Sequence, residues 1–305
     1  MELSSQMVLF ARVVDEGSLS AAARTLNQSP SAVSKQVSHL EDRVGVRLLN
    51  RSSSGISLTD EGQQFYERCS EIAQNVTQAE EMIVSLSGKP QGRLHILSTV
   101  AFGKAQLMPV LPAFLDQYPE VQLSVDFTDT KRDFADDRID VAVQFTEQIE
   151  DQSLVARKLA PNRRVVCAAP EYLERMGTPQ RFADMAHHNY LRLSTVKSWN
   201  DWHMNDVDPA QAMARLPSNM ELNSADAVYH AALAGIGVAR LSTYLIAPDL
   251  ASGRLVRLFP EYEGKDSDIY AVYSTRRNLS PKVRALIDHL VAAFGPVPPW
   301  ERQVP

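Results

Sequence analysis

Apolar residues recur at helical spacing in three short segments at the start of the chain. The first segment ends at Gly17. The second, which is rich in alanine, ends at Asn27, a residue type that tolerates the left-handed conformation of a helix end. Ser29 and Pro30 begin the third, because serine accepts hydrogen bonds from free backbone N–H groups and proline suits the first helical turn. The pattern predicts three successive helices.

The third predicted helix has one apolar face and one small polar face. Its apolar residues step by four, three and four positions and therefore point into a core; they are Val33, Val37, Leu40 and Val44. The polar face consists of Ser31, Ser34, Lys35 and Ser38. Two strands are predicted next, at 47–51 and 55–59, and the Ser-Ser-Ser-Gly turn at 52–55 joins them into a hairpin typical of a wing.

One long helix follows the hairpin. Thr59 can cap it, and from Asp60 to about Ser87 the chain has no proline and only one early glycine. Its apolar positions alternate between steps of four and three, a heptad seam that favours pairing with a second helix. The predicted dimerisation residues are Phe65, Cys69, Ile72, Val76, Ala79, Ile83 and Leu86. The alternative is that this stripe packs onto its own domain. A hinge is predicted at 88–92, where glycine and proline recur.

From Arg93 onward, predicted strands alternate with predicted helices. The first three strands are expected at 94–98, 121–127 and 139–145. A second α/β unit begins near Arg164, and the alternation predicts a mostly parallel sheet. The strand at 267–274 and the helix at 282–294 are expected to return to the first unit, so the chain would cross twice between two lobes.

Length and charge refine this organisation. At 305 residues the chain exceeds the size at which one hydrophobic core keeps growing, so two or three compact units are expected. The net charge of −6 is unusual for a DNA-binding protein, whose contact surface is normally basic. Between Arg24 and Arg51, however, five lysines and arginines stand against two acidic residues. The charge balance therefore leaves room for a DNA-binding amino-terminal domain.

Several other classes of site are not indicated. Cys69 and Cys167 are the two cysteines, too few and too far apart for a disulfide framework or a CxxC metal site, and Cys69 is expected to act as a small buried hydrophobe. His187, His188 and His203 lack metal-ligand spacing, and the chain has no nucleophile elbow, P-loop or GxGxxG motif. We therefore expect no metal, no cofactor and no catalytic residue. Without a secretion signal or a segment apolar enough to span a membrane, a cytoplasmic protein is expected.

Residues 7 to 62 closely resemble the LysR-type transcriptional regulators. The matching segments are LFARVVDEGSLSAAARTLNQSPSAVSKQVSHLEDRVGVRLLNR and SLTDEG. The resemblance continues more weakly through Tyr118-Pro119, residues 139–142 and residues 235–239, and so covers nearly the whole chain. Where the family often has a proline after its Gly-x-Gly run, this chain has Ser242.

The resemblance implies an α+β multidomain fold in three parts. Residues 1–59 would form a winged helix-turn-helix DNA-binding domain, and residues 60–88 a long linker and dimerisation helix. Residues 89–305 would form a two-lobed α/β domain like the type 2 periplasmic binding proteins, with a small-molecule effector bound between the lobes. Lobe 1 is expected over about 93–162 and 267–295, and lobe 2 over about 163–266.

The implied function is sequence-specific transcription regulation. The protein would form a homodimer that assembles into a homotetramer, bind double-stranded operator DNA, and have RNA polymerase as a further partner. A recognition helix reads base edges near its amino-terminal half, while flanking groups contact phosphates. The expected DNA-contacting residues are Ser29, Ser31, Ser34, Lys35, Gln36 and His39 on the helix, and Arg51 and Ser53 on the wing. The alternative for this face is a solvated surface of a protein-binding bundle.

Candidate effector contacts follow from a rule for open α/β sheets, whose ligands bind beyond the carboxyl ends of the strands. The rule selects Ser98, Thr99, Phe102, Thr128 and Gln144 in lobe 1, and Asn223, Ser224 and Arg240 in lobe 2. The hydroxyls of Ser98 and Thr99, at a helix start, could hold a carboxylate. The expected effector is therefore a small metabolite such as a carboxylate. For each residue the alternative is an ordinary cap or turn.

Two other functions are compatible with a two-lobed domain. One is a solute-binding module whose amino-terminal helices serve only assembly, and the other is a lyase or transferase. The missing secretion signal and the basic recognition segment argue against the first. The missing catalytic motifs argue against the second.

Overall fold

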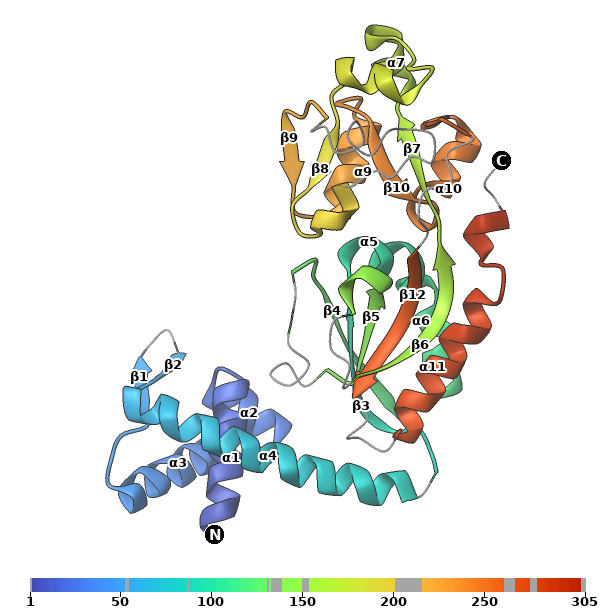
Figure 1. Cartoon of the computed structure of the whole chain (residues 1–305). Helices are drawn as coiled ribbons and strands as arrows, with labels where there is room; N and C mark the ends of the chain where they lie inside the picture. Colours follow the sequence, from blue (N-terminus) through green and yellow to red (C-terminus); the bar gives the residue numbers. More distant parts are fainter. Residues whose placement is uncertain are drawn as a thin grey trace. The chain divides into compact units, whose positions relative to one another are not determined.

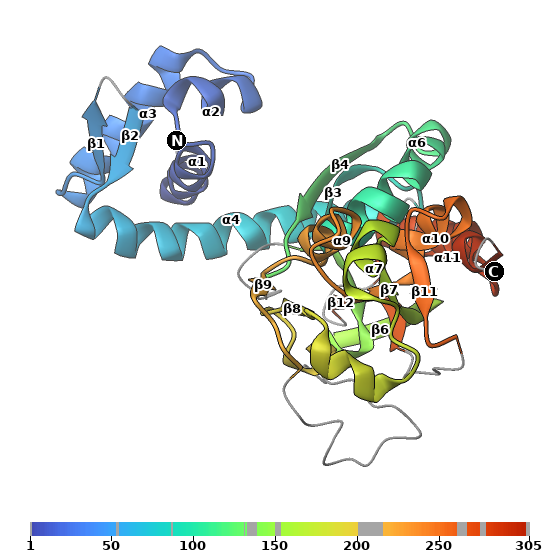
Figure 2. The same ribbon diagram turned by 90° about the horizontal axis from the view of Figure 1, so that it is seen from above.

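The chain forms two compact units, Met1–Gly88 and Lys89–Pro305. The computed structural model describes residues 2–52, 55–86, 88–130, 132, 139–149, 154–200, 216–260, 267–274 and 279–302. None of the helices in these ranges is both long and apolar enough to cross a membrane. Figure 1 and Figure 2 show the elements of each unit from two directions.

Three helices form the centre of the amino-terminal unit: α1 (Leu3–Asp15), α2 (Leu19–Thr25) and α3 (Pro30–Val44). Side-chain caps start the last two where the sequence predicts. The Ser18 hydroxyl accepts the Ala21 N–H at 3.1 Å, and the Ser29 hydroxyl accepts the Ala32 N–H at 3.2 Å. The apolar face of α3 is fully buried through Val33, Val37 and Leu40.

A carboxylate fastens the wing to α3. Strand β1 (Leu49–Ser52) pairs antiparallel with β2 (Gly55–Leu58). Glu41 of α3 accepts the backbone N–H groups of Leu48 and Leu49 through one oxygen, at 2.8 and 3.1 Å. Because hydrogen bonds to an ionised acceptor are stronger than neutral ones, this contact fixes the end of α3 to the start of the hairpin.

Gly62 lets the long helix α4 (Asp60–Leu86) begin directly against the wing (Figure 2). The Thr59 hydroxyl caps the helix by accepting the Gly62 N–H at 2.9 Å, and it donates to the Arg47 carbonyl at 2.8 Å. A Cβ atom on Gly62 would lie 2.0 Å from the Leu48 carbonyl oxygen. This backbone contact is the physical reason for glycine at the end of the SLTDEG segment.

The first half of α4 packs into the amino-terminal unit itself. Cys69 and Ala73 are buried in the same cluster as α1, and the rings of Phe10 and Phe65 lie 5.8 Å apart. The prediction that Cys69 contacts a second subunit is therefore wrong, because α1 covers this part of the seam. The predicted boundary between residues 59 and 60 likewise divides one packed core. Burial also raises the pKa of the Cys69 thiol to about 12, so the thiol stays protonated.

Lobe 1 of the second unit is built on a five-stranded sheet with the order β4-β3-β5-β12-β6. Its strands are β3 (Gly92–Ser98), β4 (Val121–Phe127), β5 (Val141–Phe145), β6 (Leu154–Asn162) and β12 (Ser267–Ser274). β3 is parallel to β4 and β5, but β12 is antiparallel to β5 and β6. The prediction of a mostly parallel sheet is thus wrong for half of these strand pairs. β6 leads from lobe 1 to lobe 2 and β12 leads back, so the two strands run in opposite directions.

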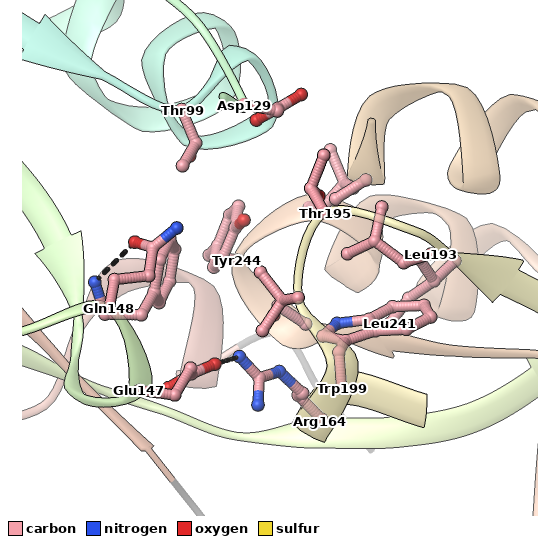
Figure 3. A pocket seen from close by; sticks show the side chains of 15 residues that line it. Thr99, Asp129, Glu147, Gln148, Arg164, Leu193, Thr195, Trp199, Leu241 and Tyr244 are labelled. Atoms are coloured by element: carbon pink, nitrogen blue, oxygen red, sulfur yellow. Dashed lines mark hydrogen bonds and ion pairs between the residues drawn. The ribbon is translucent and has the colours of Figure 1, made fainter. Parts of the chain in front are cut away.

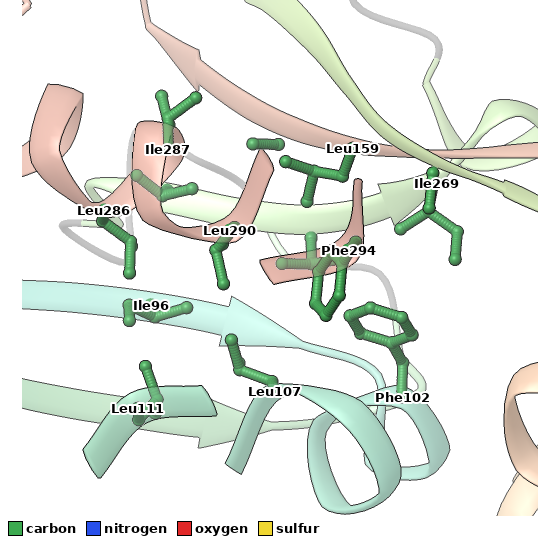
Figure 4. Packing of buried hydrophobic residues seen from close by; sticks show 14 of the residues in the cluster. Ile96, Phe102, Leu107, Leu111, Leu159, Ile269, Leu286, Ile287, Leu290 and Phe294 are labelled. Carbon is green, nitrogen blue, oxygen red and sulfur yellow. The ribbon is translucent and has the colours of Figure 1, made fainter. Parts of the chain in front are cut away.

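Helices α6 (Met108–Gln117) and α11 (Pro281–Phe294) pack together on one face of this sheet. Figure 4 shows Ile96 of β3 among four leucines of the helical segments: Leu107 and Leu111 before β4, and Leu286 and Leu290 of α11. Phe102 packs edge-on against Phe294, with ring centroids 5.7 Å apart. The short elements α5 (Val100–Phe102) and η1 (Gly103–Leu107) lead from β3 into α6.

Lobe 2 contains the antiparallel sheet β10-β7-β11 and the parallel pair β8 and β9. The strands are β7 (Arg164–Ala168), β8 (Leu191–Leu193), β9 (Met220–Leu222), β10 (Ala239–Ser242) and β11 (Val256–Leu258). The helices are α7 (Pro170–Met176), α9 (Ala225–Leu233) and α10 (Thr243–Ser252), with the short turns η3 (Phe182–His187) and η4 (Lys197–Asn200). A Cβ atom on Gly237 would lie 2.5 Å from the Asn189 carbonyl oxygen, which explains the second glycine of the Gly-x-Gly run.

Two neighbouring strands carry the chain between the lobes. β6 and β12 pair along their lengths, from Leu154 opposite Ser274 to Asn162 opposite Ser267. At the lobe 2 end the Asn162 amide donates to the Ser267 hydroxyl at 2.9 Å, and both side chains are buried. The two crossings predicted from the sequence are therefore adjacent in space.

The last described segment fastens this crossing point to the core of lobe 1. In η5 (Pro299–Arg302), the buried Trp300 ring lies 5.4 Å from that of Phe294. The next residue, Glu301, forms an ion pair with Arg163 at 3.4 Å, directly after β6. The end of the chain is thereby tied to the point where the lobes join.

Gly62→Ala should destabilise the amino-terminal unit by about 1 to 3 kcal/mol, because the new methyl group overlaps the Leu48 carbonyl. Thermal unfolding of the full chain by far-ultraviolet circular dichroism should show an earlier loss of helix. Tryptophan fluorescence should not change, because Trp199, Trp202 and Trp300 all follow residue 89. Gln63→Ala, at the exposed neighbouring position, is the control; equal melting of the two variants would contradict the close contact.

Candidate functional site

Helix α3 presents small polar side chains on the face opposite its buried residues. Ser31 and Lys35 are exposed and lie one turn apart, and Ser34 beside them is half-buried. At the helix start, the Ser29 and Ser31 hydroxyls are hydrogen-bonded at 3.0 Å. A helix face with little bulk and one cation can approach the edges of DNA bases closely.

Two other predicted DNA-contacting residues are oriented by neighbouring side chains. Nε2 of Gln36 donates to Oε1 of Gln28 at 3.0 Å, and Nδ1 of His39 lies 2.9 Å from Nε2 of the buried Gln6 on α1. Each side chain therefore keeps only part of its hydrogen-bonding capacity for another partner. The side chains of the predicted wing residues lie outside the described residues; they are Arg51 and Ser53.

The second half of α4 keeps exposed apolar positions from the predicted dimerisation stripe. Val76 is 42% exposed, Ala79 is exposed, and Ile72 is half-buried. The side chains of Ile83 and Leu86 lie outside the part of the chain that the structure describes. Of the stripe, Val76 and Ala79 are therefore the described residues available to a second subunit.

The two lobes enclose a cleft of about 520 Å³, counting the part that is open to solvent (Figure 3). Lobe 1 contributes Thr99, Asp129, Phe145, Glu147 and Gln148. Lobe 2 contributes Arg164, Leu193, Thr195, Val196, Trp199, Ala225, Leu241, Ser242, Tyr244 and Leu245. The mixture of apolar walls with a few polar groups is typical of small-molecule sites.

An ion pair joins the lobes at one end of this cleft. Arg164 at the start of β7 donates to Glu147 in η2 (Thr146–Gln148), and their side chains are 11% and 18% exposed. Figure 3 shows the pair below Tyr244. Burial raises the pKa of Tyr244, with the Arg164 charge acting in the opposite direction, so the phenol stays neutral.

On another wall, a carboxylate of the protein binds the backbone at a helix start. Oδ1 of Asp129 accepts the Val100 N–H at 3.2 Å, at the beginning of α5. Oδ2 of Asp129 and Oγ1 of Thr99 are buried and have no hydrogen-bond partner among the described residues. Thr99 and Asp129 lie side by side in Figure 3. This wall of the cleft therefore carries unsatisfied oxygen atoms.

Two further contacts hold the lobes together beside the cleft. Nζ of Lys104 in η1 lies 3.0 Å from both carboxylate oxygens of Asp226 in α9. The side-chain amide of Gln106 donates to the Tyr244 carbonyl at 2.7 Å. Both contacts run from lobe 1 to lobe 2, so they must break or shift if the lobes move apart.

One of the eight predicted effector contacts lines this cleft, and the other seven are not among its lining residues. Thr99 lines it. Ser98 precedes Thr99, and Ser224 precedes the lining residue Ala225; each has a buried hydroxyl without a partner among the described residues. Phe102, in contrast, is fully buried in the aromatic core of lobe 1. The prediction that it contacts a ligand is wrong, because the turn of α5 directs the ring inward.

The other four predicted contacts are not among the lining residues. Gln144 and Arg240 each lie one position before a residue that lines the cleft, and successive residues of a strand point to opposite faces. The Thr128 hydroxyl is bound to that of Thr130 at 2.8 Å, in a local turn. Asn223 is exposed before α9.

The sequence-based selection missed the charged residues of the cleft. Asp129 and Glu147 follow β4 and β5 by two positions each, so a wider window beyond the strand ends would include them. Arg164 begins β7 in an antiparallel sheet, where the rule for parallel strands does not apply. Trp199 gives no signal in the sequence, because only the packing of η4 in lobe 2 brings it to the cleft.

Family comparisons identify both units. A family model described as "LysR substrate binding domain" matches residues 87–295, and one described as "Bacterial regulatory helix-turn-helix protein, lysR family" matches residues 4–63. The chain belongs to the LysR family of transcriptional regulators. The predicted fold class and function, a DNA-binding regulator with an effector-binding domain, are confirmed at the level of this family.

This LysR-family chain is similar to named regulators over nearly its whole length. The transcriptional activator TtdR of Escherichia coli K12 is 31% identical over 291 residues, which cover 95% of this chain and 93% of TtdR. The solved structure of CrgA from Neisseria meningitidis is 32% identical, with a TM-score of 0.61 over 94% of this chain and 97% of CrgA. The Vibrio cholerae virulence activator AphB, 24% identical, shares the fold with a TM-score of 0.63 over 96% of this chain and 99% of AphB.

Arg164→Met should destabilise the regulatory unit of this LysR-family protein by about 2 to 3 kcal/mol, because Glu147 would be left in a largely buried position without its partner. The free energy of unfolding is measured by urea titration of the full chain with tryptophan fluorescence.

Arg181→Met is the matched control for this measurement. Arg181 pairs with Asp184 at 3.3 Å, but its side chain is 82% exposed, so its loss should cost much less than the loss of Arg164. Equal costs for the two substitutions would argue that the Arg164 pair does not join the lobes.

Proposed function

We propose that this LysR-family regulator reads its operator with α3 and adjusts its DNA binding to the occupant of the interlobe cleft. The division of α3 into two faces carries the first part of the proposal. Val33, Val37 and Leu40 are fully buried, and Ser31 and Lys35 are exposed on the opposite side. Small side chains allow the helix to lie close to the groove floor, and the lysine adds the charge that DNA binding requires.

Lys35 is expected to contribute most among these residues. A lysine can donate to guanine O6 and N7 or to a phosphate, and it carries a positive charge. The hydroxyls of Ser31 and Ser34 can also contact a base or a phosphate, but they are neutral. The amino-terminal end of α3, capped by Ser29, suits a phosphate because its backbone N–H groups point outward. Gln36 and His39, already bonded to neighbours, are proposed to orient the reading face as well as to contact DNA.

The distal half of α4 is proposed as the dimer contact. An exposed valine at Val76 and an exposed alanine at Ala79 continue the apolar seam beyond the part that α1 covers. Paired recognition helices match a near-palindromic operator, and dimers are proposed to pair into a homotetramer. RNA polymerase is a proposed further partner, and the cytoplasm, where operator DNA lies, is the proposed location.

The interlobe cleft is proposed as the effector site, where the small molecule is bound and not transformed. Both lobes supply its walls, so a ligand that fits the closed arrangement shifts the equilibrium by its difference in affinity between the two states. The Lys104–Asp226 ion pair, which also joins the lobes, has only a small effect on this equilibrium. The lysine is 54% exposed, and such pairs contribute at most about 1 kcal/mol. Ligand contacts would therefore contribute more than this ion pair to the equilibrium between the two lobe arrangements.

Lys35→Ala should weaken operator binding by about 1 to 3 kcal/mol if the lysine contacts a base. If it contacts only phosphate, binding should weaken equally for all sequences, and the slope of log K against log salt should fall by about one unit. Fluorescence anisotropy with operator and unrelated duplexes, over a range of salt concentrations, separates the two cases.

Arg68→Ala is the control for that titration. It removes one positive charge from the same unit, but from an exposed position on α4, where the side chain is 75% exposed and paired with Glu71. Binding should change little. Equal losses in both variants would mean that overall charge, and not the α3 face, determines affinity.

Val76→Asp combined with Ala79→Asp should convert the protein to monomers and weaken operator binding, because two carboxylates in an apolar seam would have no partner. Light scattering measures the mass in solution. Glu67→Ala, an exposed change on the same helix, should leave the mass unchanged. A double variant that stays dimeric would mean that the subunits meet elsewhere.

A further inference from the structure

We infer that the interlobe cleft selects a ligand with an apolar body and an N–H donor group, as in an amine or a primary amide, and discriminates against carboxylates. This inference rests on the proposed role of the cleft as the effector site. It replaces the sequence-based expectation of a carboxylate, because the position in which a carboxylate was expected is occupied by a side chain of the protein.

Asp129 holds that position. The sequence-based expectation placed a ligand carboxylate at the start of the helix after β3, held by the hydroxyls of Ser98 and Thr99. In the structure the Val100 N–H already donates to Oδ1 of Asp129 at 3.2 Å. A second carboxylate beside Asp129 would compete for this donor and meet a like charge at short range.

The same side chain leaves an acceptor unsatisfied. Oδ2 of Asp129 is buried and has no hydrogen-bond partner among the described residues, and Oγ1 of Thr99 beside it is in the same state. A buried carboxylate oxygen without a donor is costly. An occupant of the cleft with an N–H group would supply that donor, and a positive charge on it would strengthen the bond.

The charge of the lining favours a cation or a neutral molecule. Three of the fifteen lining residues are charged: Asp129, Glu147 and Arg164. Arg164 and Glu147 form an ion pair with each other, so the formal charge of the described lining residues is −1 and is carried by Asp129. Nε of Arg164 is buried without a hydrogen-bond partner among the described residues, but Glu147 neutralises its charge, so Arg164 offers a ligand carboxylate no net positive charge.

An apolar wall faces these polar groups. Leu193 and Trp199 are 4% exposed and Leu241 is 1% exposed, and all three line the cleft. Tyr244 and Leu245 of α10 extend the apolar lining. An aromatic or branched aliphatic body would be buried here, while the N–H group reaches Asp129 on lobe 1.

The test uses three probes that share one benzyl body: phenethylamine, 2-phenylacetamide and phenylacetate. Dissociation constants are measured on the full chain by ligand-observed NMR titration up to tens of millimolar. Phenethylamine and 2-phenylacetamide should each bind at least about tenfold more tightly than phenylacetate. Phenylacetate binding as tightly as either of them, or no binding by any probe, would overturn the inferred ligand class.

Asp129→Asn tests the residue responsible. Asparagine keeps Oδ1 as the acceptor for the Val100 N–H, but it removes the charge and replaces the acceptor Oδ2 with the donor Nδ2. The affinity for phenethylamine should fall about tenfold, whereas that for phenylacetate should rise, because Nδ2 can donate to a carboxylate. A variant in which both affinities change by the same factor would show that Asp129 does not recognise the ligand charge.

Two substitutions fill the cleft from lobe 2: Ala225→Trp and Thr195→Phe. They distinguish a wrong ligand class from a wrong assignment of the cleft as the effector site. If amine binding survives both changes, the cleft is not the binding site and the proposed role fails. If phenylacetate binds tightly and either change abolishes its binding, the cleft is the site and only the ligand class is wrong. Tryptophan fluorescence melting, with Thr195→Phe as the milder change, verifies that each variant is folded.

Discussion

The pairing of β6 with β12 is the interaction on which the regulatory unit depends. These strands carry the chain out of lobe 1 and back, and antiparallel pairing along their lengths joins Asn162 to Ser267, 105 positions away. Because β7 begins directly after this point, the pairing also brings Arg164 of lobe 2 to Glu147 of lobe 1. The cleft, its ion pair and the attachment of η5 all follow from the position of this crossing.

The electrostatics of the cleft are set by which charges the protein pairs internally. A buried ion pair gains about as much from attraction as it loses in desolvation, so the Arg164–Glu147 pair joins the lobes more than it adds net stability. The backbone donor at Val100 is satisfied by Asp129, while the other carboxylate oxygen of Asp129 and Nε of Arg164 have no hydrogen-bond partner among the described residues. The lobe contact and the proposed ligand recognition therefore use different charged side chains of the same cleft.

The amino-terminal unit combines a reading surface and a long helix in one core. Helix α4 has 27 residues, a length of about 40 Å, and its first half is packed through Phe65, Cys69 and Ala73 against the helix bundle. The first half cannot turn without moving α1, because their side chains interlock. A rotation imposed on the distal half of α4 would thus be transmitted to the helices that position α3.

The sequence by itself determined the order and type of most elements. Periodicity and caps located α1, α2 and α3, and the family motifs identified the domain types, because these features depend on neighbouring residues. Tertiary structure alone decided that α1 covers Cys69, that β12 runs antiparallel to its neighbours, and that Asp129, Glu147 and Arg164 meet at one cleft. A heptad seam looks the same whether its partner is another subunit or a helix of the same domain. The side of a strand that faces a cleft likewise depends on register and on the second lobe, which no local pattern encodes.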